Sequence, residues 1–127
     1  MAKNIIKITP TKAIVQIIDA GATISLATDL LFAGTVQAGF APQVVSGTPK
    51  VNITGVTYSL PSASGSLVTR GGANVLALQN SDNKEFQYSI VMNNTSDIVV
   101  TCPSGGMVIL ELSKIGGYSD VIPNIAA

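Results

Sequence analysis

The 127-residue chain contains no histidine, no tryptophan and a single cysteine, Cys102. Without histidine, one chain cannot build a His-ligated metal site, a Ser-His-Asp triad or a Cys-His pair, and one cysteine cannot form a disulfide framework. Charged residues are only 11% of the chain, against about 25% in an ordinary soluble domain. Seven cations balance seven anions, so no basic footprint for nucleic acid is present.

The abundant residues favour β-structure. Isoleucine occurs 14 times, valine 13 times and threonine 11 times, and these branched side chains suit a pleated sheet. Serine, asparagine and glycine supply most of the polarity and are typical of turns. Because the net charge is zero, copies of the chain repel one another little. We therefore expect an all-β protein that functions within an assembly.

Short runs with alternating apolar and polar residues predict strands joined by tight turns. Gly55 changes the phase of one alternation and predicts a β-bulge. Residues 28–34 predict either one helical turn, capped by Thr28 or Asp29 and ended by Gly34, or a further strand. Loops are expected at 38–50, with a short edge strand at 44–45, and at 61–66 and 80–84. Strands are expected at 12–18, 22–27, 51–60, 67–70, 74–79, 85–92, 97–101 and 107–113.

Strands at this spacing predict a single antiparallel β-sandwich, or a barrel-like meander, over residues 1–127. Residues 1–11 are expected to be an extended N-terminal arm, and residues 114–127 an apolar C-terminal tail without periodicity. No signal peptide or transmembrane span is expected, because no apolar run is long enough. Apolar side chains in the arm and the tail gain free energy when a neighbouring subunit covers them. The predicted subunit or capsid contacts are Ile5, Ile6, Ile8, Val121, Ile122 and Ile125.

Two arrangements suggest catalysis only weakly, and we expect no enzyme. Asp19 and Asp29 are candidates for a carboxylate pair, but a turn residue and a helix cap explain them better. Ser104 with Lys114 as its base is a candidate nucleophile pair, although Pro-Ser-Gly-Gly is an ordinary turn sequence. The Cys102 thiol has no histidine to activate it and is expected to be a small, partly buried hydrophobe.

Candidate ligand sites are equally weak, so no cofactor or metal is expected. Arg70 followed by two glycines lacks the helix and the third glycine of a phosphate-binding turn. Asp82 and Glu85 do not have the spacing of a calcium loop. Three tyrosines could stack on a sugar ring, but alternation places two of them inward and leaves only one outside. These are Tyr58, Tyr88 and Tyr118, of which Tyr118 is the outer one.

Three features extend over the whole chain: an early apolar segment, a compact set of strands that ends in an apolar strand, and a surface of low charge. The early segment is Ile5-Ile6-Lys7-Ile8, the closing strand is Met107-Val108-Ile109-Leu110-Glu111-Leu112, and the surface residues are mainly Ser, Thr, Asn and Gly. In these features the chain resembles the small capsid decoration, or cement, proteins of tailed bacteriophages. The resemblance implies binding on the outer face of an icosahedral shell, often as trimers that clamp neighbouring coat subunits. It transfers no individual functional residue, since no motif of fixed spacing carries it.

The expected function is therefore that of a structural virion protein on the capsid exterior, made in the host cytoplasm. Its expected partners are itself, as a trimer, and a major capsid protein, with no nucleic acid, membrane or small-molecule substrate. The alternative is an extracellular adhesive or carbohydrate-binding β-sandwich, of fimbrial or tail-fibre type. A coat protein of the small RNA phages is disfavoured, because the predicted strands lack clustered lysine and arginine and no C-terminal helix is expected.

Overall fold

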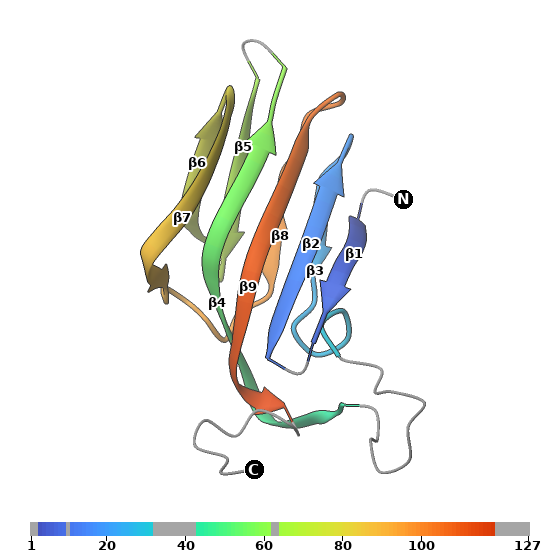
Figure 1. Cartoon of the computed structure of the whole chain (residues 1–127), viewed down its shortest axis with the longest axis vertical. Coiled ribbons are helices and arrows are strands. Elements are labelled where there is room, and N and C mark those ends of the chain that lie inside the picture. The colour runs from blue at the N-terminus through green and yellow to red at the C-terminus, as the bar shows by residue number, and fades with distance from the viewer. Residues whose placement is uncertain (1–2, 10, 32–42, 62–63, 119–127) are drawn as a thin grey trace.

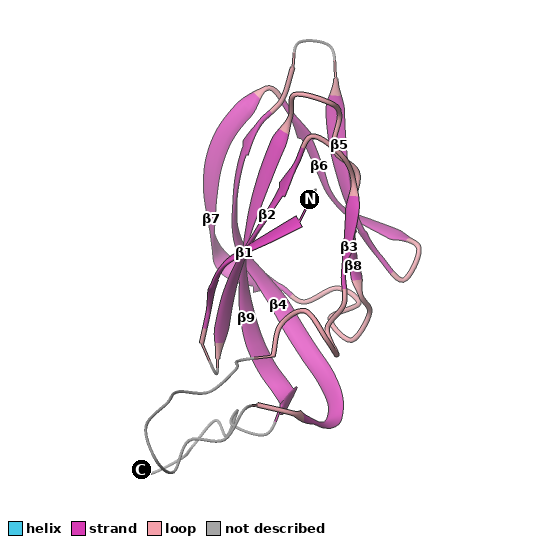
Figure 2. Ribbon diagram, turned by 90° about the vertical axis from the view of Figure 1, so that its right-hand side faces the viewer, coloured by secondary structure: helices cyan, strands magenta, loops and turns pink. Residues whose placement is uncertain are grey.

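The computed structural model describes residues 3–9, 11–31, 43–61 and 64–118. Within these ranges the chain forms nine β-strands and no helix. Two antiparallel sheets lie face to face, as the edge-on view in Figure 2 shows. The predicted all-β class, with antiparallel sheets in a sandwich, is therefore confirmed.

Sheet A holds five of these strands and sheet B four (Figure 1). In sheet A the order is β1 (Lys3–Ile8), β2 (Lys12–Ile18), β9 (Met107–Tyr118), β4 (Val45–Ser59) and β7 (Ser81–Ile90). In sheet B the order is β3 (Ala22–Ile24), β8 (Ile98–Val100), β5 (Gly65–Arg70) and β6 (Ala73–Gln79).

The strand pairing shows that the chain folds back on itself as one long hairpin. β2 pairs with β9, β3 with β8, β4 with β7, and β5 with β6. Pairing of β4 with β9 and of β5 with β8 then rolls this hairpin into two sheets. Such an arrangement is a jelly roll, with β1 added at one edge of sheet A.

The core lies between the two sheets and is built by the alternation of side chains along each strand. On β2, Ala13, Val15 and Ile17 are buried, whereas Ile14, Gln16 and Ile18 lie on the opposite face and are partly covered. Burial of apolar side chains at roughly 25 cal/mol per Å² stabilises this arrangement. Other strands contribute in the same way, with Ile24, Val51, Ile53, Val56, Val68, Ile98, Val108, Leu110 and Leu112 in the core.

The predicted bulge at Gly55 is confirmed. Between Ile53 and Gly55 the register of β4 shifts toward both of its neighbours, β7 and β9. The extra residue lets Ile53 and Val56 both point into the core, although three positions separate them. The change of phase in the sequence therefore marks a real change of face along β4.

Three predicted loops or tails are strands in the structure. Residues 45–50 begin β4 because Gly47, at φ 96°, turns the backbone and lets the strand continue to pair with β9. The connection expected at 80–84 is wrong from residue 81 onward, because Asn80 alone makes the turn at φ 68°. The first five residues of the expected tail continue β9 as far as Tyr118, whereas residues 119–127 lie outside the described residues.

The expected N-terminal arm includes an edge strand. Lys3–Ile8 pairs with β2, with a register shift between Ile5 and Lys7. An ion pair of 2.6 Å joins Lys3 Nζ to Asp29 Oδ2 and ties β1 to the segment that follows β3. Residues 3–8 are therefore part of sheet A rather than a free arm.

The expected helical turn at 28–34 is not formed in its described part. Residues 26–29 make a turn, and Asp29 Oδ2 accepts the backbone N–H of Ser25 at 2.7 Å. The carboxylate therefore binds a donor that precedes it, whereas a helix cap would bind a donor that follows. Residues 32–34 of that prediction lie outside the described residues.

A fully buried guanidinium holds the loop after β7 against the core. Arg70 Nε and Nη2 donate to the carbonyl of Ser96 at 3.0 and 2.8 Å, Nη2 also donates to Asn94, and Nη1 donates to Val51 at 2.5 Å. Burial lowers the pKa of Arg70 to about 10, so the group stays charged at neutral pH. Backbone carbonyl dipoles from three residues stabilise that charge.

Replacement of Arg70 by Met should destabilise the fold strongly. Arg70→Met removes the side-chain donor from the carbonyls of Val51 and Ser96, at about 1–3 kcal/mol for each, whereas the carbonyl of Asn94 keeps the N–H of Val51. We therefore expect a loss of at least about 2 kcal/mol in the free energy of unfolding. Urea denaturation measures it. Lys50 is exposed, so Lys50→Met is the matched control, and its free energy of unfolding should stay within about 0.5 kcal/mol of the wild-type value. A loss below about 1 kcal/mol for Arg70→Met would contradict this role.

Two adjacent glycines near the end of β9 should respond differently to alanine. Gly117 has φ 80°, and a Cβ there would collide with the backbone carbonyl of Thr48, whereas a Cβ on Gly116 would meet nothing within 4 Å. We expect Gly117→Ala to lower the free energy of unfolding by more than about 1 kcal/mol and Gly116→Ala to leave it nearly unchanged. Equal stability of the two variants in urea would contradict this expectation. It would show that the paired ends of β4 and β9 can move apart to accommodate the added Cβ.

Candidate interaction surfaces

The two suggested catalytic pairs do not form. Asp19 Oδ1 accepts the backbone N–H of Gly105 at 3.1 Å, and Asp29 is bound to Lys3 and Ser25, so each carboxylate has its own structural partner. Ser104 lies in the turn before β9, and Lys114 lies seven residues into that strand, which is about 23 Å along an extended chain. No Ser-Lys pair is therefore possible.

Lys114 has a structural role at the end of the sandwich where β4 begins and β9 ends, which is the lower end in Figure 1. Its Nζ donates to the carbonyl of Thr9 at 2.9 Å and to Gln43 Oε1 at 2.7 Å, and lies 5.1 Å from the centre of the Tyr118 ring. Burial raises the pKa of Tyr118 to about 12, and its neutral hydroxyl donates to the carbonyl of Leu26 at 2.6 Å. These contacts close that end of the core and explain why β9 extends to Tyr118.

The other candidate ligands are buried or dispersed. Burial raises the pKa of the Cys102 thiol, which makes this group a poor nucleophile. Asp82 and Glu85 lie three residues apart on β7 and so face opposite sides of it. Across the described residues, no three or more Cys, Asp or Glu side chains gather as a metal site. Tyr58 and Tyr118 are both buried, whereas the side chain of Tyr88 is outside the described part.

The predicted contact residues of β1 separate into two groups. Ile5 is 40% exposed and Ile6 is 52% exposed, whereas Ile8 is partly buried and packs against the core. Ile5 and Ile6 are therefore available to a neighbour along the edge of sheet A. Val121, Ile122 and Ile125 lie outside the described residues.

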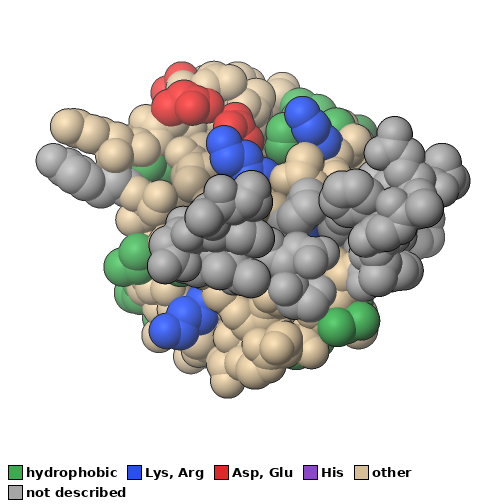
Figure 3. Space-filling model, turned by 60° about the horizontal axis from the view of Figure 1, so that its bottom comes forward, with side chains coloured by type: hydrophobic (Ala, Val, Ile, Leu, Met, Phe, Trp, Pro, Cys, Tyr) green, Lys and Arg blue, Asp and Glu red, His purple; other side chains and the backbone are tan. Residues whose placement is uncertain are grey.

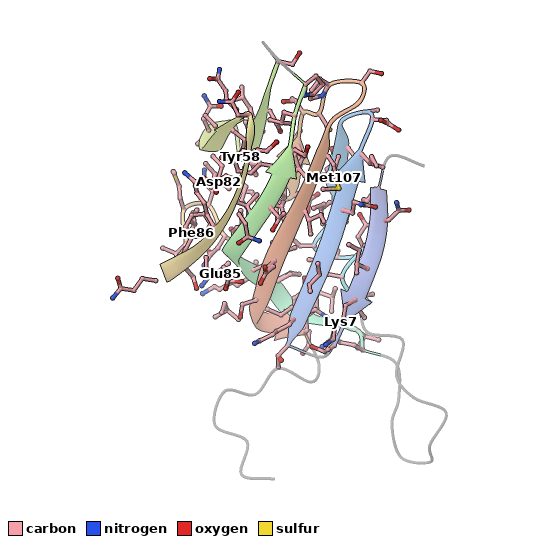
Figure 4. All side chains as sticks on the ribbon, turned by 45° about the horizontal axis from the view of Figure 1, so that its top comes forward. Lys7, Tyr58, Asp82, Glu85, Phe86 and Met107 are labelled. Carbon is pink, nitrogen blue, oxygen red and sulfur yellow. The ribbon has the colours of Figure 1, made fainter. Side chains whose placement is uncertain are left out.

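The exposed face of sheet A carries a carboxylate pair that sequence reasoning missed. Gly55 pairs with Glu85 on one side and with Glu111 on the other, so the two acids flank a residue without a side chain. A Cβ at Gly55 would lie 3.3 Å from both Cδ and Oε2 of Glu111, which shows that this carboxylate lies over the glycine. Figure 4 labels Glu85 on this face. Only the strand register brings the two acids together.

Proximity to Glu85 affects the ionisation of Glu111. Burial raises the pKa of Glu111, and the charge and hydrogen bonding of Glu85 raise it further, while Lys12 on β2 lowers it. Lys7 and Lys12 also line a hollow of about 130 Å³ beside the Glu111 side chain. These effects favour the protonated form of Glu111, and loss of that proton at neutral pH opposes folding.

Among the described residues, the large exposed hydrophobic side chains lie in four places on the surface. They occur on the edge strand β1, on the outer face of sheet B, after the end of β7, and where β4 begins and β9 ends. Figure 3, which looks toward the lower end, shows hydrophobic side chains in separate patches. The residues are Ile5, Ile6, Leu67, Val99, Val91, Met92, Val44, Val45 and Ile115.

No known protein-family model matches this chain, and no curated protein matches it. Among the described residues, none belongs to a helix with the length and hydropathy needed to cross a membrane.

The carboxylate pair predicts a measurable pH dependence. Since the folded state raises the pKa of Glu111 above its unfolded value of about 4.3, the folded state binds more protons, and stability should rise as the pH falls through the folded pKa. Glu111→Gln should therefore stabilise the protein at pH 7 relative to wild type, and this advantage should vanish near pH 4. Urea denaturation across that range measures the difference.

Two further variants control for this effect. Glu85→Gln removes one cause of the raised pKa, so it should reduce the pH dependence, whereas Lys12→Met removes a lowering charge and should increase it. Identical pH profiles for wild type and Glu111→Gln would show that the pair does not influence folding.

Proposed function

We propose that this protein is a structural, non-enzymatic virion protein of a bacteriophage, with a decoration or cement role on the capsid exterior. The supporting observation is the distribution of exposed hydrophobic side chains over several sides of one small domain. A protein that binds one small ligand needs one concave site, whereas a subunit surrounded by neighbours needs contacts on several sides. The proposed partners are further copies of the chain, as a trimer, and a major capsid protein.

The jelly-roll topology is compatible with this proposal but does not decide it. Viral capsid domains, lectins and cupins all use this arrangement, and one fold supports many functions. A histidine-ligated metal site cannot be built within one copy, because the chain lacks histidine. A sugar-binding module would present aromatic rings on its surface, whereas Tyr58 and Tyr118 lie inside the core. The virion role therefore agrees better with the described surface than the adhesive role does.

The direct test is to find the protein on particles. Phage particles from the source of this chain would be banded on a density gradient, probed with an antibody against the purified protein, and labelled with immunogold for electron microscopy. We expect the protein to band with the shell and the gold to lie on its exterior. Its complete absence from the particle band would overturn the proposal, and glycan-dependent thermal stabilisation would favour the adhesive alternative.

Deletion of residues 1–8 should weaken particle binding and leave the roll folded. Among the described strands β1 pairs with β2 alone, so its removal leaves the remaining strands of sheet A in place and removes the exposed Ile5 and Ile6. The loss of the Lys3–Asp29 ion pair and of Ile8 packing should cost some stability. Co-sedimentation with particles measures binding, and circular dichroism checks the fold. Unchanged binding by the folded truncation would contradict a contact role for β1.

A further inference from the structure

The exposed face of sheet B carries no charged side chain. Among its strands β3, β8, β5 and β6, the only charged residue is Arg70, which is fully buried on the inner face. The other charged residues of the described chain lie on sheet A or in loops, as Lys12, Glu85 and Glu111 illustrate. In Figure 2 no described segment covers the outer side of sheet B. The two faces of the sandwich therefore differ sharply in charge.

Two apolar side chains stand at the centre of this uncharged face. Val99 on β8 pairs with Thr23 on one side and with Thr69 on the other. Leu67 lies on the same face, two residues before Thr69 on β5. It pairs with Ala77 of β6, and its carbonyl accepts the N–H of Thr101 at 2.9 Å. Val99 and Leu67 are each 39% exposed. Together they form a raised apolar pair among small or uncharged neighbours.

Shallow hollows lie on either side of this pair. One, of about 580 Å³, is lined by Gly65, Leu67, Ala77 and Gln79 among others, and the second, of about 430 Å³, is lined by Gly21, Ala22, Thr23 and Val99 among others. Thr101 borders both. Glycine and alanine supply little side chain, so these hollows leave room for the raised side chains of a facing surface.

The sheet edges are poorly suited to adding a strand from another molecule. β1 carries Lys3, Lys7 and a bulge, and β7 carries Asp82, Lys84 and Glu85. β3 is only three residues long, and the register of β6 shifts against β5. Charges, bulges and short length are the devices that prevent edge pairing. Association is therefore expected through a face rather than through an edge.

We propose that the outer face of sheet B docks onto the same face of a second copy of this chain about a twofold axis. Leu67 and Val99 of each copy enter the hollows of the other. A partner on this face must itself be uncharged, because a charge buried there would have no counter-ion. The same face of another copy meets that requirement, and its raised pair and hollows complement each other. This self-docking goes beyond the proposed virion role: it is a contact separate from the proposed trimer, which concerns copies bound on the capsid, and it can be measured on the isolated protein.

The size of the face predicts a weak dimer. With strands about 4.8 Å apart and about 3.3 Å per residue, sheet B covers roughly 300 Å² in projection. Two such faces bury less than the 1,200 Å² or so of a stable complex. We therefore expect the isolated protein to be a monomer at micromolar concentration and a dimer toward millimolar concentration. Copies that are held close together on a surface would have an effective concentration in the millimolar range.

Sedimentation velocity over this concentration range tests the proposal. The wild type should change from a 13.0 kDa species to one of twice that mass. Leu67→Lys places a charge in the docked face and should weaken dimerisation at least about tenfold. Ile6→Lys makes the same change on an exposed isoleucine of β1 and should leave dimerisation unchanged. Circular dichroism confirms that each variant is folded.

A monomeric wild type at every concentration, or equal dimerisation by wild type and folded Leu67→Lys, would overturn the proposal. If Leu67→Lys does not fold, Val99→Thr replaces an apolar methyl by a hydroxyl at the same face and should weaken dimerisation more mildly. A weaker dimer in Ile6→Lys alone would place self-association on β1 instead. Particle labelling is independent of these results, so failure of self-docking and failure of the virion role are distinguishable.

Discussion

The ladder between β4 and β9 is the contact on which the rest of the structure depends. It joins the two longest strands, from Ser59 opposite Met107 to Val45 opposite Tyr118. Both strands place alternate apolar side chains in the core, and both continue past the other strands to the lower end (Figure 1). Because β4 and β9 lie far apart in sequence, their pairing closes the roll and positions the remaining hairpin partners beside them.

Features of this ladder explain polar groups both on the exposed face of sheet A and inside the core. The bulge at Gly55 keeps the apolar side chains of β4 inward and leaves a gap over which the Glu111 carboxylate lies. At the lower end, Val51 of β4 accepts a hydrogen bond from Arg70, and Lys114 and Tyr118 of β9 close the core. Arg70, Lys114 and Tyr118, which are buried, all have hydrogen-bond partners, as a low-dielectric interior requires.

The two sheets differ in what they present to their surroundings. Sheet A combines charged side chains with an exposed apolar edge, whereas the outer face of sheet B is uncharged and carries Leu67 and Val99 at its centre. This difference does not follow from composition, because the charged residues are few and spread along the chain. It arises because β3, β8, β5 and β6, which contain almost none of them, come together in one sheet. Contacts on several sides are what an assembly subunit needs.

The sequence by itself determined the β class, the alternation on β2 and β9 and the bulge at Gly55, because these depend on side-chain type and on the period of neighbouring residues. It underestimated β4, because Gly47 turns the backbone without ending the pairing of β4 with β9, and it underestimated β7, because Asn80 alone turns the chain from β6 in sheet B to β7 in sheet A. The pairing of β9 with the start of β4 extends β9 beyond its predicted end. Only the tertiary structure decided which strands are neighbours. The Glu85–Glu111 pair, the burial of Arg70 and the uncharged face of sheet B all follow from that non-local pairing, which no local pattern encodes.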